Sequence, residues 1–180
     1  MPLEVTRNIG YLPENNPLYD YMYVREYLLY MAQMSGLEKQ QRLTRVEELV
    51  DMVGLGKMAN KRIKELSKGY KQRVGFAQAL LGVPEILILD DSSSALDYKT
   101  DASMRKAISQ HHADSTTIMI AQRVSSIMNM TKILVMDNGR VIGYGTHEEL
   151  LESCPDYRSI YEIQIETKVE KEVKANAAKR

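Results

Sequence analysis

Two acidic residues close a short apolar segment in the second half of the chain. Ile86 to Leu89 is an unbroken aliphatic run, and Asp90 and Asp91 follow it directly. Such a run is typical of a strand buried on both faces of a parallel sheet. Ligands of open α/β sheets bind beyond the carboxyl ends of the strands, so this strand would deliver a carboxylate to a site. One acid could hold a Mg²⁺-bound water while its neighbour orients an attacking water. Capping of the next turn is the alternative.

A second candidate device is the segment from Leu66 to Arg73, which reads Leu-Ser-Lys-Gly-Tyr-Lys-Gln-Arg. Ser67 is a favoured residue for capping the start of a helix. Backbone N–H groups and the positive end of a helix attract phosphate oxygens, and Lys68 would add charge beside the small Gly69. Taken in isolation, the same segment favours the simpler interpretation of a capped surface helix.

Periodicity and helix breakers predict the elements that position these residues. A helical region over residues 24–82 is followed by short strands that alternate with helices. The predicted elements are an apolar piece at 9–12; helices marked by Val24, Leu28 and Met31, by Leu43, Val46, Val50 and Val53, and by Ser67 to Leu81; a strand at 86–89; a helix near 98–109; a strand at 116–121; and a hairpin of 132–137 and 140–144 around Asn138-Gly139. Thr146 to Glu149 forms a capping box, which predicts a helix with His147 on its surface.

Composition limits the classes of protein that fit. The 180 residues are 44% hydrophobic and 27% charged, as in an ordinary globular domain. Lys+Arg and Asp+Glu both number 24, so no net field indicates a nucleic-acid or membrane-surface partner. The single cysteine, Cys154, excludes a disulfide framework. No apolar run approaches the ~20 residues of a membrane span, and no signal peptide is visible. We therefore expect a cytosolic setting.

The order of these motifs resembles the nucleotide-binding domain of ATP-binding cassette (ABC) transporters from about residue 8 to residue 165. The resemblance implies an α/β fold: a partial P-loop NTPase (ABC-type) parallel sheet with an α-helical subdomain insert. It implies a domain at 1–165, with the helical subdomain at about 20–82 and the Walker B, D-loop and switch region at 85–165. Residues 166–180 would be a charged tail.

The resemblance also implies roles at a site for ATP and Mg²⁺. Asp90 is in the Walker B position that holds Mg²⁺, and Asp91 is in the place of the catalytic glutamate. Glu14, in Tyr-Leu-Pro-Glu, looks like the Q-loop residue that touches the Mg²⁺ site and couples to the membrane subunit. Gln122 is in the place of the switch histidine.

Other residues are implied to act across a dimer of two ABC domains. Ser67, Lys68 and Gly69 are similar to the signature Leu-Ser-Gly-Gly-Gln, which reaches ATP bound on a partner subunit. Ser94 and Asp97, in Ser-Ala-Leu-Asp, look like the D-loop. The partners implied are a second ABC ATP-binding domain and a transmembrane subunit, with no nucleic acid. That subunit would place the chain in the cytoplasm, peripheral on the inner face of the plasma membrane.

The sequence departs from the family pattern at the hydrolytic positions. Glu14 replaces glutamine, Asp91 replaces glutamate, Gln122 replaces histidine, and Lys68 and Tyr70 alter the signature. The Walker A pattern G-x-x-x-x-G-K-[ST] has no match in the 180 residues. In the family that loop precedes the Q-loop, so we expect the chain to correspond to the downstream two-thirds of a domain. Lacking its amide cradle and lysine, the isolated chain is predicted to bind MgATP weakly or not at all.

Two branches of the family are resembled by different parts of the chain. Residues 1–84 are similar to ATP-binding subunits of the gliding-motility and ABC-2 type, and residues 90–165 to the ATP-binding half of multidrug-type exporters. A recombined gene is one hypothesis for this pattern.

Three functions remain open from the sequence. The chain could be an ABC-type ATPase subunit that powers transport. It could instead be a non-catalytic interaction module that supplies signature and D-loop residues to a partner's ATP site. The third is the product of a truncated gene, whose open sheet edge would tend to aggregate.

Overall fold

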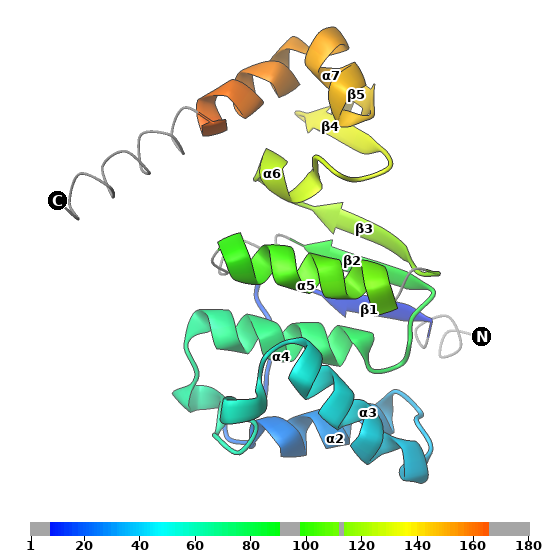
Figure 1. Cartoon of the computed structure of the whole chain (residues 1–180), viewed down its shortest axis with the longest axis vertical. Coiled ribbons are helices and arrows are strands. Elements are labelled where there is room, and N and C mark those ends of the chain that lie inside the picture. Colours follow the sequence, from blue (N-terminus) through cyan, green and yellow to red (C-terminus); the bar gives the residue numbers. More distant parts are fainter. Residues whose placement is uncertain (1–7, 91–97, 112–113, 166–180) are drawn as a thin grey trace, which may run out of the picture. The chain divides into compact units, whose positions relative to one another are not determined.

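The computed structural model describes residues 8–90, 98–111 and 114–165 (Figure 1). The chain divides into two compact units, Met1–Ile120 and Ala121–Arg180. The first contains β1 (Ile9–Leu12), α2 (Val24–Met34), α3 (Lys39–Met52), two 3₁₀ turns (Gly56–Met58 and Ile63–Glu65), α4 (Lys68–Leu80), β2 (Ile86–Asp90), α5 (Tyr98–His111) and β3 (Thr116–Ile120). The second contains α6 (Val124–Ile127), β4 (Ile133–Asp137), β5 (Arg140–Gly145), α7 (His147–Ser153) and a helical segment at residues 155–165.

The first unit is built on a three-stranded parallel sheet in the order β1-β2-β3. In the register of this sheet Leu12 lies opposite Leu89, and Asp90 lies opposite Ile120. Adjacent parallel strands need a long crossover, and between β1 and β2 the chain inserts α2, α3 and α4. The predicted α/β fold, a parallel sheet with an α-helical insert, is confirmed.

The prediction that β2 is buried on both faces is wrong. Leu87 and Leu89 are fully buried in one core with Met104 and Ile108 of α5, whereas Ile86, on the opposite face, is 37% exposed. Strand side chains alternate between faces, and the helical cover lies on the Leu87 side. The other face carries further exposed apolar side chains, namely Tyr11, Ile118 and Ile120.

The helices of the insert form where the periodicity predicts them. Helix α3 buries Val46, Leu49 and Val50 and ends before Gly54, whose φ of 67° suits a glycine at a helix end. The sequence predicts Leu43 on the same apolar face of α3, but its side chain is exposed. The buried residues of α3 begin at Val46.

The second unit begins with the hairpin that the sequence predicts. β4 and β5 pair antiparallel around Asn138 and Gly139, which both have positive φ, as a two-residue hairpin turn requires. The capping box at α7 is also present. The Glu149 N–H donates to Thr146 Oγ1 at 3.3 Å, and the Thr146 N–H donates to Glu149 Oε2 at 2.7 Å.

His147 is not on the helix surface, so that prediction is wrong. Its ring is buried, and Nδ1 lies 2.8 Å from the Tyr157 hydroxyl. It also packs edge-on to Tyr157 and Tyr161 at centroid distances of 5.7 and 4.9 Å. Tyr157 and Tyr161 of the helical segment 155–165 cover the His147 ring, which a capping pattern alone does not reveal. Among the described helices, none is long and apolar enough to cross a bilayer.

Candidate functional site

Asp90 is the last residue of β2, at the carboxyl edge of the sheet. β1 ends beside it, and Glu14 follows the last residue of β1 by two positions. The side chain of Asp90 is half-buried, whereas Glu14 is exposed. The parallel register thus delivers Asp90 and the segment that carries Glu14 to one edge, and the position of Asp90 at the end of a strand agrees with the sequence prediction.

Alternation along β2 puts Asp90 on the open face of the sheet, the face that carries Ile86 and Ile88. Its neighbour in register, Ile120, is 54% exposed. The carboxylate therefore lies at the end of an apolar surface and is partly shielded from water. A half-buried carboxylate of this kind can bind a hard cation without a surrounding cage of protein ligands.

Ser67 begins helix α4 and remains accessible. It is the N-cap residue, its Oγ accepts the Tyr70 N–H at 3.5 Å, and both Ser67 and Lys68 are exposed. Free N–H groups of the first turn and the lysine ammonium therefore meet at one exposed corner. This matches the capped helix start that the sequence predicts for the segment.

The connection between α4 and β2 puts Ser67 on the same side of the first unit as Asp90. Only residues 81–85 join the end of α4 to the start of β2, so the chain reverses there. The two elements have similar lengths, about 20 Å for α4 and about 16 Å for β2 at standard rises. Figure 1 shows the N-terminal end of α4 and the arrowheads of β2 and β3 on the left.

Two glycines allow α4 to pack closely on β1 and the loop after it. A Cβ at Gly10 would lie 2.2 Å from the Ala79 carbonyl oxygen, and one at Gly75 would lie 1.7 Å from Asn16 Nδ2. Asn16 Nδ2 also donates to the Lys71 carbonyl at 3.4 Å. The loop that carries Glu14 is thereby fixed against α4. Sequence reasoning missed this contact, although a glycine inside a helical pattern was its signal.

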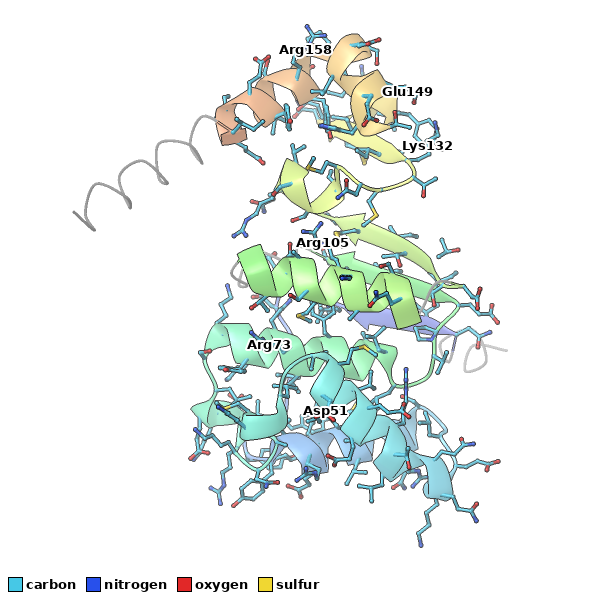
Figure 2. The ribbon with its side chains drawn as sticks, viewed as in Figure 1. Asp51, Arg73, Arg105, Lys132, Glu149 and Arg158 are labelled. Carbon is cyan, nitrogen blue, oxygen red and sulfur yellow. The ribbon has the colours of Figure 1, made fainter. Side chains whose placement is uncertain are left out.

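Arg73 joins three elements of the first unit (Figure 2). Nη1 donates to the carbonyls of Val53 and Gly54, at 3.3 and 3.4 Å, just past the end of α3. Nη2 donates to Thr100 Oγ1 in the first turn of α5 at 2.9 Å, and the guanidinium carbon lies 5.0 Å from the centre of the Tyr70 ring. A positive group is favourable at a helix C-terminus. The Arg73 side chain also links α4 to α5 through its bond to Thr100.

The remaining candidate residues are placed less completely. Asp91, Ser94 and Asp97 lie outside the described residues. Gln122 is described, is exposed, and precedes α6 by two positions in the second unit. The described candidate residues are therefore Asp90 and Glu14 at the sheet edge, and the turn from Ser67 to Gly69, which we call the signature turn after the motif that it resembles.

A family model with the description "ABC transporter" matches residues 3–94. The chain belongs to the ABC transporter family. It is 39% identical over 170 residues to a probable multidrug resistance ABC transporter ATP-binding/permease protein, YheI, of Bacillus subtilis. It is 34% identical over 163 residues to YfiB, an uncharacterized ABC transporter ATP-binding protein of the same organism.

These matches cover most of the chain but only part of each relative. They span 91% and 88% of this chain and 29% and 28% of YheI and YfiB. YheI therefore matches both halves of the chain, and the recombined-gene interpretation stays a hypothesis.

Two solved structures show the same fold as this ABC family member. A bacterial Atm1-family ABC exporter with ATP bound has a TM-score of 0.73 at 27% identity, over 89% of this chain and 29% of that one. A dimeric bacterial ABC transporter cassette also has a TM-score of 0.73, at 22% identity, over 80% of this chain and 65% of that one; this match shows the fold alone.

Proposed function

We propose that this chain is part of the ATP-binding subunit of an ABC transporter, in which ATP binding and hydrolysis drive transport across a membrane. The observation that carries the proposal is geometric. Asp90 at the carboxyl edge of the sheet and the exposed signature turn at Ser67 lie on the same side of one unit. The subunit would be cytoplasmic and held at the inner face of the membrane by a transmembrane partner.

The acidic edge supplies the metal-binding part of this function. Mg²⁺ takes oxygen ligands and is usually held by one or two carboxylates together with substrate phosphates and water. The half-buried carboxylate of Asp90 and the exposed carboxylate of Glu14 fit that donor set. Bound MgATP would supply the phosphoanhydride bond to be cleaved, and its Mg²⁺ would be the positive charge that the carboxylates balance.

Two further side chains would act on the reacting groups. Asp91 would orient the attacking water, but its side chain is one methylene shorter than glutamate. A displacement of about 1 Å can cost ~10²-fold in rate. Gln122 would donate a hydrogen bond to the γ-phosphate, but unlike histidine it cannot become cationic. A site built from these residues is therefore expected to turn over slowly.

The signature turn would act on a nucleotide held by a second ABC domain. Ser67, Lys68 and Gly69 present a hydroxyl, an ammonium group and free backbone N–H groups to that domain. Ser94 and Asp97 would approach the same interface. The permease part of the YheI name supports a transmembrane partner as well.

A second function is supported by the exposure of the signature turn, which leaves Ser67 and Lys68 accessible to a second domain. In this case the chain completes the ATP site of a partner and does not itself bind the triphosphate of a nucleotide. The two functions differ in MgATP affinity. Low-micromolar binding to the 180-residue chain would support the catalytic subunit, and weak or absent binding would support the module that acts in trans.

A mixing experiment tests the shared part of both functions. The ATP-binding domain of the Bacillus subtilis relative YheI is assayed for ATP turnover with and without this chain. We expect the wild-type chain to change the rate and Ser67→Arg to abolish that change. Ser109→Arg, which alters another exposed serine of the first unit, is the control and should behave as wild type. An unchanged rate with the wild-type chain would contradict the proposal.

A further inference from the structure

Helix α6, which follows the switch position, begins without a cap of its own. It is a single turn, Val124–Ile127, and its N-cap residue Arg123 makes no side-chain capping bond. The first N–H groups of a helix have no partner within it. The Val124 N–H finds its acceptor far along the sequence, at Oε1 of Gln164, 2.9 Å away.

The same side chain also holds the backbone of the switch residue. Gln164 Nε2 donates to the Gln122 carbonyl oxygen at 2.8 Å. One amide group thus bridges the two backbone groups on either side of Arg123. A terminal carboxamide carries an N–H donor and a carbonyl acceptor side by side and is uncharged at neutral pH, so the Gln164 side chain suits both backbone groups at once.

Contacts with α7 fix the helical segment that carries Gln164. Gln164 lies in the helical segment 155–165, which is attached to α7 by the bond between His147 and Tyr157 and by the packing of Tyr161 on His147. The Val124 side chain is buried in one core with Tyr157, so side chain and main chain of the same residue are both held by the helical segment. All of these groups belong to the second unit.

We infer that Gln164 is a positioning residue for the switch segment. It fixes the backbone on both sides of Arg123, and it thereby limits the directions in which the Gln122 side chain can point. The role of Gln122 toward a γ-phosphate rests on the proposed function, whereas the contact made by Gln164 does not. The helical segment 155–165 would therefore hold residues 122–124 in position.

Two substitutions in the full 180-residue chain separate the donor from the acceptor. Gln164→Leu removes both hydrogen bonds with little change in size. Gln164→Glu keeps an acceptor for Val124 but places a carboxylate oxygen against the Gln122 carbonyl, which repels it. Glu162→Gln, at an exposed position of the same helical segment, is the matched control.

Amide hydrogen exchange and the side-chain amide resonances of Gln122, both measured by NMR, report on the contact. We expect Gln164→Leu to speed exchange of the Val124 amide about fivefold to tenfold, the effect of losing its one ordinary hydrogen bond to Gln164. In Gln164→Glu that amide should stay largely protected while the Gln122 resonances shift, and Glu162→Gln should match wild type. Unchanged Val124 exchange in Gln164→Leu, or unchanged Gln122 resonances in Gln164→Glu, would overturn the inference. Should the leucine variant fail to fold, the glutamate variant decides.

A second NMR measurement, made with MgATP, separates the role of Gln164 from the proposed role of Gln122. With MgATP at high concentration and the YheI domain present, the wild-type Gln122 resonances should move, and they should move less in Gln164→Leu. If MgATP moves nothing in the wild type, the proposed role of Gln122 fails, while the exchange result still decides the role of Gln164. An equal MgATP response in wild type and in a folded Gln164→Leu variant would overturn the positioning role.

Discussion

The close approach of α4 to β1 gives a sharp test of how the sequence holds α4 beside the loop that carries Glu14. In Gly10→Ala the added Cβ would meet the Ala79 carbonyl oxygen at 2.2 Å, and also Pro84 Cγ at 2.9 Å and Leu87 Cδ1 at 3.0 Å. Carbon and carbonyl oxygen normally stay about 3.3 Å or more apart, so the two backbones must separate by about 1 Å. The nearest obstacle is backbone, so no side chain can turn away to relieve it.

The expected cost follows from what overpacking does to a closed core. Forcing an extra methyl group into such a site costs about 1–3 kcal/mol. The gain from a stiffer unfolded chain, about 0.4–1 kcal/mol, offsets only part of it. Gly56→Ala is the matched control, because its φ is not positive and its nearest neighbour would be Asp51 Oδ1 at 4.0 Å. We expect the control to be neutral or slightly stabilising.

Urea unfolding followed by circular dichroism measures the difference. With a slope of about 1–3 kcal/mol per molar urea, a loss of ~2 kcal/mol lowers the midpoint by roughly 1 M. Amide hydrogen exchange should also become faster in β1 and at Asn16, because the loop after β1 packs less closely on α4. A Gly10→Ala midpoint equal to that of Gly56→Ala would refute the packing argument.

Three further predictions concern the groups around the site. Arg73→Met should destabilise the chain by about 1–3 kcal/mol in urea unfolding, because charge-assisted bonds to two helix-end carbonyls and to Thr100 are lost; an unchanged midpoint would contradict the bracing role. Burial, aided by the nearby Tyr19, raises the pKa of Tyr27 to about 12, so folding is favoured fully below the unfolded value of 10.0, and the contribution is lost as pH rises toward 12. Tyr27→Phe should flatten that alkaline loss of stability, and a pH profile identical to wild type would count against it. In an ABC domain completed with a Walker A segment, Asp91→Glu should raise steady-state ATP turnover, and no gain would argue against the distance argument.

Local signals in the sequence predict the parts of the site that depend on neighbouring residues. The aliphatic run before Asp90 predicts a strand, and Ser67 before Lys68-Gly69 predicts a capped helix start. The Asn138-Gly139 pair predicts the hairpin. Each of these is decided within a few residues by turn geometry, capping or alternation, so the pattern in the sequence is sufficient.

Other features depend on contacts between distant segments. Gln164 and Val124 are 40 positions apart, and the bond between them leaves no periodic trace in the sequence. His147 satisfies a capping-box pattern yet is buried, because a later helical segment covers it. The open face of β2 was missed for the same kind of reason, since an aliphatic run does not reveal which of its two faces the helices cover.

Nucleotide-dependent association with a second ABC domain is the most direct test of the role proposed for the signature turn. Sedimentation velocity compares an equimolar mixture of this chain and the YheI ATP-binding domain with and without MgATP. We expect a larger species only with MgATP, and we expect it to disappear with Ser67→Arg but not with Ser109→Arg. Identical sedimentation with and without MgATP, or an unaffected Ser67→Arg complex, would contradict the claim that the signature turn of this chain meets a nucleotide held by a second ABC domain.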